Sequence, residues 1–194
     1  MRIKICGITN LTDALLAEAK GADYLGFIFA KTSKRFVAYD KAKEIIAKLT
    51  TASAVGVFVD DDFDEIERAA HDLGLYAVQL YAPVTRRFDN IKVIQAVKVE
   101  NAIDEEMLNN PYANFYLLDA ARQGQCGGLG LTFDWTMIPG NFDNIFLAGG
   151  VSMENVEEAL KKPVYALDVS SSVEVSPGVK DHRKLEVLLK RVKQ

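Results

Sequence analysis

The sequence has few of the residues on which several protein classes depend. It contains two cysteines, two histidines and one tryptophan in 194 residues. No apolar run approaches the roughly 20 residues that a membrane-spanning helix requires. No run of Lys or Arg is present to bind nucleic acid or an anionic membrane. Residues 1–5 lack the apolar stretch and the small-residue cleavage site of a secretory signal. These absences predict a cytoplasmic protein with free thiols and with no nucleic-acid or membrane partner.

The composition is that of an ordinary globular protein. Apolar residues make up 49% of the chain and charged residues 26%, which argues against a disordered or fibrous chain. The 23 basic and 27 acidic side chains give a net charge of −4. The length suits one domain with a full core, and no linker or low-complexity stretch divides it. We therefore expect a single domain over residues 1–194.

Short apolar runs alternate with segments of helical periodicity along the whole chain. Several runs, such as residues 24–29, are apolar on both alternating faces, which suits parallel strands covered on both sides. Eight strands are expected, over residues 3–8, 24–29, 54–59, 77–81, 92–99, 115–119, 144–148 and 165–169. Strict alternation of strands and helices leaves an open doubly wound sheet or a closed barrel. Eight units favour an α/β fold of the (β/α)8 TIM-barrel type.

Start and stop signals support several of the intervening helices. Asp62 and Glu65 have the spacing of a capping box, Ser152 is placed to cap a later helix, and Gly21 is placed to end the first. An apolar stripe predicts the last helix, through residues 185, 188, 189 and 192. Residues 84–90, 102–108 and 121–139 leave little room for long helices. The sequence thus predicts a compact barrel with shortened connections after strands 4 to 6.

Polar side chains interrupt the apolar runs where the predicted strands end, and chemistry in such barrels lies at that end. Cys6 lies near the end of the first strand, Asp119 ends the sixth, and Asp168 lies near the end of the eighth. A thiol and a carboxyl at one barrel mouth could serve as base and acid if the pKa of Cys6 is lowered and that of Asp119 raised. Taken alone, Cys6 is equally consistent with a small buried apolar residue, and Asp119 with a carboxylate that caps a loop.

Glycines and hydroxyls follow the last two predicted strands. Gly149 and Gly150 would let backbone N–H groups approach an anion, and the hydroxyls and amides of Ser170, Ser171 and Ser172 would lie beside them. Barrels often bind phosphate at this place. The alternative is an ordinary turn next to a polar loop.

The remaining histidines and cysteine are not grouped in a catalytic or metal-binding pattern. His71 and His182 fall on predicted helices, where we expect them to be solvated, so neither a histidine-centred triad nor a zinc site is expected. Cys126 lies in a Gly-rich loop, and we interpret it as an incidental thiol.

A series of short motifs runs the length of the chain. In order they are KICGIT (4–9), GADYLGFIF (21–29), SKRFV (33–37), VGVFV (55–59), VQL (78–80), LLDA (117–120), GGLG (127–130), FDW (133–135), LAGG (147–150), DVSS (168–171) and PGVKD (177–181). Together they resemble the phosphoribosylanthranilate isomerase family of tryptophan biosynthesis. The resemblance covers essentially the whole chain, and the ordered set is far more specific than any one motif.

The resemblance implies a monomeric or homodimeric barrel that converts N-(5′-phosphoribosyl)anthranilate into 1-(2-carboxyphenylamino)-1-deoxyribulose 5-phosphate, with no metal or organic cofactor. On the family pattern, Asp119 protonates the ribose ring oxygen and opens the sugar to a Schiff base, and Cys6 then removes the C2′ proton. Arg35 would bind the anthranilate carboxylate. Asp168 would contact the sugar end or orient other polar groups, and a loop that includes Gly128 would cover the substrate.

The sequence departs from the family pattern around the expected site. The family usually has Ser-Pro-Arg, Gln-Leu-His-Gly, Thr and Ser-Ser-Gly where this chain has Lys34 before Arg35, Gln79-Leu80-Tyr81-Ala82, Leu129 and Ser172. Gln79 and Tyr81 are still expected to line the substrate site. Tyr81 replaces a histidine with a bulkier phenol, and Ala82 adopts a positive φ less easily than Gly. We expect activity, reduced or with a shifted substrate preference.

Two other functions remain open from the sequence. One is a related barrel enzyme acting on another aminated ribose phosphate, such as the isomerase of histidine biosynthesis or indole-glycerol-phosphate synthase. Those enzymes use different acid and base residues. The other is a degenerate barrel that binds a phosphorylated ligand or a partner protein with weak or no turnover, which Tyr81, Ala82 and Ser172 would favour.

Overall fold

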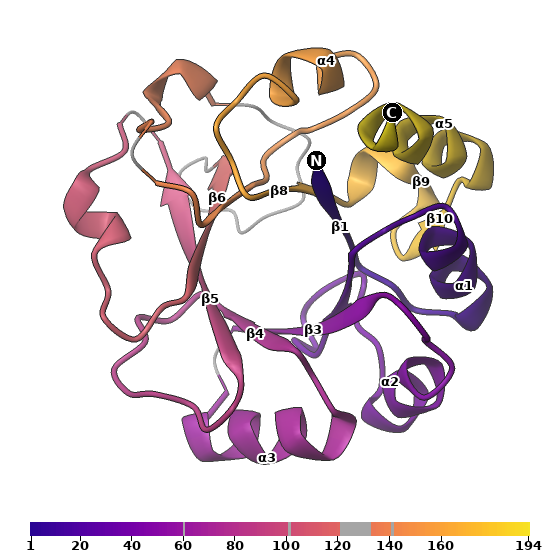
Figure 1. Cartoon of the computed structure of the whole chain (residues 1–194). Coiled ribbons are helices and arrows are strands. Elements are labelled where there is room, and N and C mark those ends of the chain that lie inside the picture. Colours follow the sequence, from indigo (N-terminus) through magenta and orange to yellow (C-terminus); the bar gives the residue numbers. More distant parts are fainter. Residues whose placement is uncertain (60, 101, 121–132, 141) are drawn as a thin grey trace.

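The computed structural model describes residues 1–59, 61–100, 102–120, 133–140 and 142–194. Its eight parallel strands close into a barrel in chain order (Figure 1). The strands are β1 (Arg2–Cys6), β2 (Tyr24–Ile28), β3 (Ser53–Phe58), β4 (Ala77–Leu80), β5 (Lys92–Val99), β6 (Phe115–Ala120), β7 (Ile145–Leu147) and β8 (Ala166–Val169). Each lies within two residues of its predicted bounds. The predicted (β/α)8 barrel is confirmed.

Strand β1 closes the barrel by pairing with β2 on one side and β8 on the other. In this register Lys4 lies opposite Tyr24 of β2 and opposite Asp168 of β8. Parallel strands point their carboxyl ends to the same end of the barrel. The side chains that end β1, β6 and β8 are therefore brought together although they are far apart in sequence.

Helices cover the outside of the barrel unevenly (Figure 1). The longer ones are α1 (Leu11–Ala19), α2 (Tyr39–Ile46), α3 (Phe63–Leu73) and α5 (His182–Lys193), and α4 (Val156–Ala159) is a single turn. The connection from β4 to β5, residues 81–91, contains no helix. The next two contain the short 3-10 helices η1 (Glu105–Leu108) and, within the described part, η2 (Trp135–Met137). The predicted shortening after strands 4 to 6 is confirmed.

The predicted helix signals are confirmed in three cases and wrong in one. Asp62 accepts from the backbone N–H groups of Asp64 and Glu65 at the start of α3. Gly21 follows the last cap of α1 with φ of 94°, a left-handed conformation that suits glycine. The stripe in α5 is buried, as predicted. Ser152 does not cap α4: the N-cap is Asn155, because an extra turn separates Ser152 from the helix.

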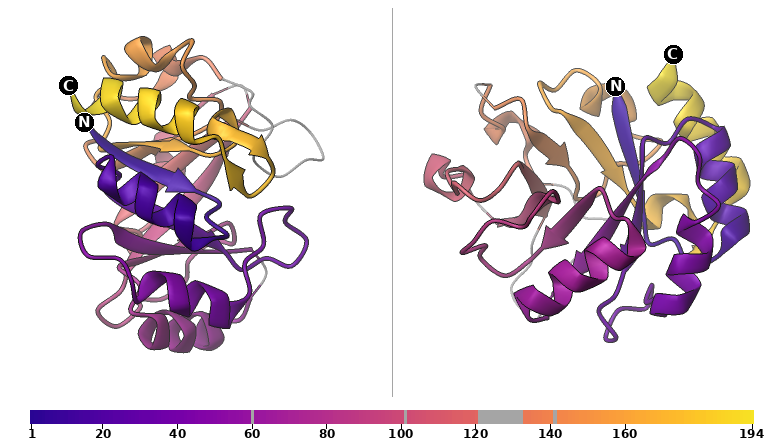
Figure 2. Two further views of the ribbon diagram at one scale, coloured as in Figure 1. Left: turned by 90° about the vertical axis from the view of Figure 1, so that its right-hand side faces the viewer. Right: turned by 60° about the horizontal axis from the view of Figure 1, so that its bottom comes forward.

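A small antiparallel hairpin follows β8 and was not predicted. It consists of β9 (Glu174–Ser176) and β10 (Val179–Lys180), and it is preceded by the 3-10 helix η3 (Ser171–Val173). Its turn contains Pro177 and Gly178, a pair that favours turns. Figure 2 (left) shows the hairpin and the loop between β2 and α2 at the same end of the barrel, away from the N-terminus.

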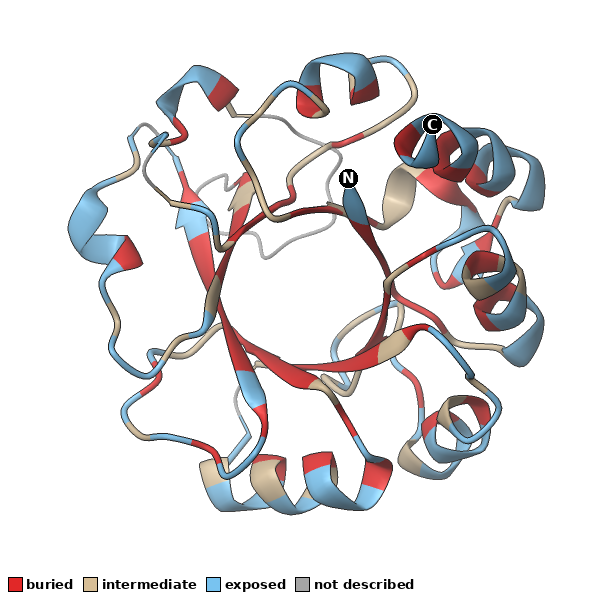
Figure 3. Cartoon of the chain, viewed as in Figure 1, coloured by how far each residue is buried: buried red, intermediate tan, exposed pale blue. Residues whose placement is uncertain are grey.

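Buried side chains form an outer layer between strands and helices and a second cluster inside the barrel (Figure 3). The inner cluster is capped at the amino ends of the strands by aromatic rings, which include Tyr24 and Phe146. Among the described residues, no helix combines the length and apolarity needed to cross a membrane. At the carboxyl ends of the strands, polar side chains predominate, and Tyr81 is the aromatic residue that packs against the cluster there.

Candidate active site

Strand β1 projects Lys4 and Cys6 into the barrel mouth. Lys4 is fully buried, and its Nζ donates hydrogen bonds to Asp168 Oδ1 at 2.7 Å and to Gln79 Oε1 at 3.0 Å. Both β1 side chains pass over Gly26 of β2. A Cβ at position 26 would lie 2.7 Å from Cys6 Sγ and 3.2 Å from Lys4 Cε. Glycine at position 26 thus provides the space that these two side chains occupy.

The buried charges around Lys4 set the protonation of the site. Burial by itself lowers the pKa of Lys4, but the charge and the hydrogen bond of Asp168 act against it, so this pKa is raised and Lys4 is an ammonium. Burial raises the pKa of the Cys6 thiol, and the charge of Lys4 only partly opposes that rise. The lowered pKa that would favour Cys6 as a base is therefore not found, because the thiol is enclosed by the barrel.

Asp119 lies on β6 at the same end of the barrel, one residue from the end of the strand. Burial, and secondarily the negative charge of Asp168, raises the pKa of Asp119 to about 6, whereas Lys4 acts in the opposite direction. This is the direction of the pKa shift that an acid role for Asp119 requires. A carboxyl with such a pKa holds its proton far more readily than an exposed aspartate, which is the property that an acid catalyst needs.

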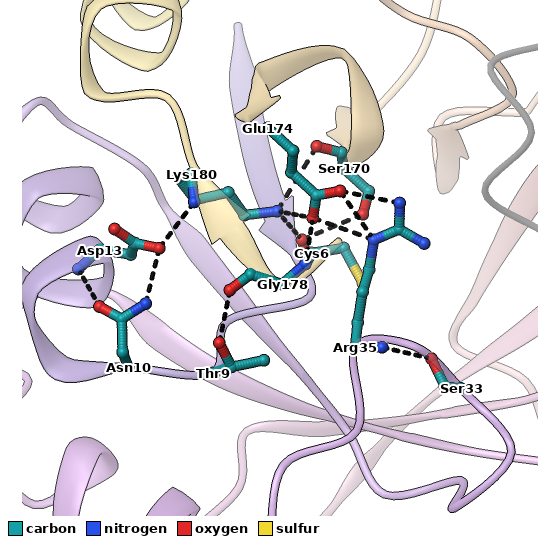
Figure 4. Close-up of polar contacts among 10 residues, drawn as sticks. All are labelled: Cys6, Thr9, Asn10, Asp13, Ser33, Arg35, Ser170, Glu174, Gly178 and Lys180. Carbon is teal, nitrogen blue, oxygen red and sulfur yellow. Dashed lines mark hydrogen bonds and ion pairs between the residues drawn. The ribbon is translucent and has the colours of Figure 1, made fainter. Parts of the chain in front are cut away.

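Arg35 reaches the mouth from the loop between β2 and α2 (Figure 4). Its Nε donates to both carboxylate oxygens of Glu174, at 2.9 and 3.1 Å, and its Nη2 donates to Glu174 Oε2 at 2.8 Å. A Cβ at Gly7, where φ is 79°, would lie 2.6 Å from Arg35 Cδ. Gly7 therefore allows the arginine to cross the end of β1. The backbone N–H of Arg35 donates to Ser33 Oγ at 3.1 Å, which braces the loop although Lys34 replaces the usual proline.

The loops after β7 and β8 have the backbone expected of an anion site, but two of the three serine hydroxyls after β8 are already engaged. Gly149 and Gly150 have φ of 70° and 81°. No acceptor among the described residues receives a hydrogen bond from their backbone N–H groups. Ser170 Oγ donates to the carbonyl of Cys6 at 3.2 Å, and Ser172 Oγ donates to the carbonyl of Val151 at 2.7 Å. These two hydroxyls tie the loops together, which leaves the backbone amides and the Ser171 hydroxyl as the available donors.

The comparisons with known proteins agree with this geometry. The family model described as N-(5'phosphoribosyl)anthranilate (PRA) isomerase matches residues 3–191. The chain belongs to this family. It is 40% identical over 204 residues to the N-(5'-phosphoribosyl)anthranilate isomerase of Thermotoga maritima, which covers 100% of this chain and 98% of the relative.

Solved structures of the family have the same fold. The phosphoribosyl anthranilate isomerase of Thermus thermophilus has a TM-score of 0.89 at 37% identity, over 100% of this chain and 98% of the other. A second isomerase structure, with a TM-score of 0.84 at 36% identity, covers the same shares and is in complex with reduced 1-(o-carboxyphenylamino)-1-deoxyribulose 5-phosphate.

Gln79, which matches the family pattern, and the positions that depart from it have different environments. Gln79 is buried and supports Lys4. Tyr81 is half-buried and packs against the inner cluster at the end of β4. It also lines a groove of about 650 Å³ beside the mouth, together with Lys98 and Met107. Ala82 is not strained, because Asn90 is the one non-glycine residue with positive φ in the described part. Gly128, Leu129 and Cys126 lie outside the described residues.

The two histidines take no part in the site. His71 is exposed on α3. His182 is exposed at the start of α5, as predicted, and its Nε2 lies 2.8 Å from Asp13 Oδ1. Among the described residues, no group of three or more His, Cys, Asp and Glu side chains could hold a metal ion.

Three residues of the site had no predicted role. Lys4 lies between Ile3 and Ile5 on a buried strand. A charged residue at such a position is the feature of the sequence that could have indicated a functional role. Glu174 and Lys180 flank the Pro-Gly turn of the hairpin. This turn is the feature of the sequence that could have indicated the hairpin, which places the two side chains together.

Proposed function

We propose that the protein catalyses the Amadori rearrangement of N-(5′-phosphoribosyl)anthranilate to 1-(2-carboxyphenylamino)-1-deoxyribulose 5-phosphate in tryptophan biosynthesis. The observation that carries this proposal is the convergence of Cys6 and Asp119, from β1 and β6, on one buried mouth that contains the Lys4–Asp168 ion pair. The chain's membership of the isomerase family supports the same activity. The rearrangement moves protons only, so one acid and one base suffice.

In the first step Asp119 is the acid. Its carboxyl protonates the ribose ring oxygen, the bond from that oxygen to C1′ breaks, and the amine nitrogen supplies the electron pair that forms the protonated Schiff base. The raised pKa of Asp119, at about 6, keeps part of the carboxyl protonated near neutral pH. Acid assistance is needed because an alkoxide is a poor leaving group at this pH.

In the second step Cys6 is the base. Its thiolate removes the proton from C2′, the electron pair forms the C1′–C2′ double bond, and the imine nitrogen is neutralised to give an enolamine. The enolamine takes a proton at C1′ and loses its hydroxyl proton to become the ketone. Because the pKa of Cys6 is raised, the resting thiol is protonated near neutral pH. The reactive form, thiolate with carboxylic acid, is then the minor tautomer of the pair.

Substrate binding uses the groups around this pair. Arg35 binds the anthranilate carboxylate, and the amides of Gly149 and Gly150, with the loop of residues 170–172, bind the phosphate. Asp168, whose Oδ1 accepts a hydrogen bond from Lys4 Nζ, also accepts hydrogen bonds from the sugar hydroxyls. Gln79, Tyr81 and the loop around Gly128 complete the substrate-binding set. We further expect a cytoplasmic monomer or homodimer that uses neither a metal nor an organic cofactor.

The test is loss of substrate fluorescence on addition of the purified protein. Cys6→Ser and Asp119→Asn should each lower kcat by about 10²–10⁴-fold, because each removes one proton-transfer group. Wild-type turnover in both variants would refute the assigned roles. Tight binding of the reduced product analogue by a wild-type protein that shows no turnover would instead support the degenerate barrel.

A further inference from the structure

Glu174 is a buried carboxylate held between two cations, and neither the acid nor the base step uses it. Its side chain is 4% exposed. Besides its bonds to Arg35, Oε1 accepts from Lys180 Nζ at 2.9 Å and from the backbone N–H of Gly178 at 3.3 Å (Figure 4). The hydrogen bonds of both cations lower the pKa of Glu174 against the effect of burial, so it is ionised. A carboxylate with this many donors is fixed in one orientation.

The hairpin that carries Glu174 is anchored to the start of the barrel. The backbone N–H of Lys180 donates to Asp13 Oδ2 at 2.8 Å, and the hydroxyl of Thr9 donates to the carbonyl of Gly178. The Nζ of Lys180 also donates to the carbonyl of Cys6 at 2.6 Å. Glu174 is thus held rigidly relative to β1 and α1. Arg35, by contrast, extends from a loop whose neighbours Lys34 and Phe36 are exposed.

The contact with Glu174 uses only one edge of the Arg35 guanidinium. Nε and one hydrogen of Nη2 are engaged, and Nη1 has no protein partner within the described part of the chain. Figure 4 shows the terminal nitrogens of Arg35 on the side away from Lys180. A guanidinium has five N–H donors, so the outer edge can still hold a second carboxylate in a two-bond fork.

The cluster has an excess of positive charge. Within the trio, Arg35 and Lys180 contribute two positive charges and Glu174 one negative charge, and their side chains are 14%, 0% and 4% exposed. The nearby carboxylate of Asp13 pairs with His182 and the backbone N–H of Lys180, and not with Arg35. An anion at the outer edge of Arg35 would neutralise this excess. Carboxylate binding is therefore favoured by charge as well as by geometry.

We propose that Glu174 is the positioning residue that fixes Arg35 with its outer edge open to the substrate, and so confers selectivity for substrates that carry a ring carboxylate. This inference rests on the proposed function. Without the anchor, Arg35 would populate several rotamers, and each binding event would have to order it again. Glu174 acts through Arg35 and touches no reacting atom, so its loss should weaken binding and change chemistry little.

The test compares two ligands on Glu174→Gln, which keeps the shape and removes the charge. One ligand is reduced 1-(o-carboxyphenylamino)-1-deoxyribulose 5-phosphate, and the other is its anilino counterpart without the ring carboxylate. Calorimetry should show binding of the first weakened about ten- to a hundredfold, the range for a hydrogen bond to a charged group. Binding of the second should change less than about twofold, and the substrate KM should rise with kcat nearly unchanged.

Two further variants make the result decisive. In an Arg35→Met background, Glu174→Gln should cause no additional loss, because its effect passes through the arginine. Glu67→Gln is the matched control, since Glu67 also pairs with an arginine, Arg86, at 2.7 Å but on the outside of the barrel. It should leave binding unchanged. Equal weakening of both ligands, or a full Glu174→Gln effect without Arg35, would overturn the proposal. A wild-type protein without turnover would refute the proposed function instead.

Discussion

The two ends of the barrel interior are built from opposite kinds of residue. At the amino ends of the strands, Phe146 packs against Phe115 and Tyr24 with ring centroids 5.5 Å apart in both pairs. Tyr165 joins this cluster, and the guanidinium of Arg2 lies 4.4 Å from its ring centroid. Buried aromatic contacts of this kind stabilise a fold directly.

At the carboxyl ends, the interior holds an ammonium, a thiol and carboxyl groups, with Tyr81 beside them in place of the ring cluster. The same strand, β1, contributes to both ends, with Arg2 at one and Lys4 and Cys6 at the other. Buried charges weaken a fold unless they are paired, since they lose their hydration. The aromatic end therefore stabilises the fold. The polar end lowers the stability of the fold, because its titratable side chains are buried and their pKa values are shifted. The two ends can be separated by measuring both activity and unfolding in the same variants.

The largest effect at the polar end is expected from Lys4→Met. Loss of the ammonium leaves Asp168 buried without its partner, which should cost about 3–5 kcal/mol of unfolding free energy. It should also raise the pKa of Cys6, because Lys4 is the main group that lowers it. Each unit by which the pKa of Cys6 rises lowers the fraction of thiolate about tenfold, so we expect turnover to fall about ten- to a hundredfold.

The pH dependence of iodoacetamide alkylation at Cys6, in a Cys126→Ser background, measures this shift directly. The midpoint should move to higher pH in Lys4→Met. Arg2→Met is the matched control, since it removes one positive charge from the same strand at the aromatic end. Its alkylation midpoint should stay where it is. A midpoint that falls, or that does not move in Lys4→Met, would contradict the role given to the ammonium.

The strands and the positions of the two proton-transfer residues could be predicted from the sequence. The side-chain contacts of the polar end could not, because they join residues far apart in the chain. The alternation of apolar runs and helical stripes predicts the strands, and position at a strand end singles out Cys6 and Asp119. The pairing of Lys4 with Asp168 and Gln79 joins residues 164 and 75 positions apart. Only the register of a closed barrel decides such contacts.

The direction of the pKa shift at Cys6 was not predictable for the same reason. A thiol that acts as a base near neutral pH calls for a lowered pKa. The structure encloses Cys6 so completely that burial outweighs the neighbouring charge. The hairpin that holds Glu174 is different, because its Pro-Gly turn is visible in the sequence. Its contact with Arg35, 139 residues away, is not.

At the aromatic end, Phe146→Ala should produce the opposite result from Lys4→Met in the activity assay. Phe146 is fully buried between rings, so its truncation leaves a cavity and should cost about 3–5 kcal/mol, measured by urea unfolding. At a temperature where the variant is folded, kcat and KM should match the wild type. Phe146→Leu keeps most of the volume and should lose less stability. A large fall in kcat of the folded variant would show that the two ends are not independent.

The smallest effect has an unusual sign, since Asp119→Asn should lose activity and gain stability. Burial raises the pKa of Asp119 to about 6 from an ordinary value of 3.8, so the native state holds this proton more tightly than the unfolded chain does. The wild-type unfolding free energy therefore falls as pH rises from about 4 to about 6, and the loss of stability is complete above that range.

Asparagine at position 119 avoids this loss, so the variant should be more stable than the wild type at pH 8 by on the order of 1–2 kcal/mol. This advantage should shrink to a small fraction near pH 4, where the native carboxyl is protonated and the unfolded carboxyl, with its ordinary pKa of 3.8, is only partly ionised. Urea unfolding at pH 4, 5, 6 and 8 measures it, with Cys6→Ser as the control, because that variant is inactive but keeps the wild-type slope. If the variant is no more stable than the wild type at pH 8, ionised Asp119 does not destabilise the fold. The contrast between the two ends would then rest on the Lys4–Asp168 pair alone.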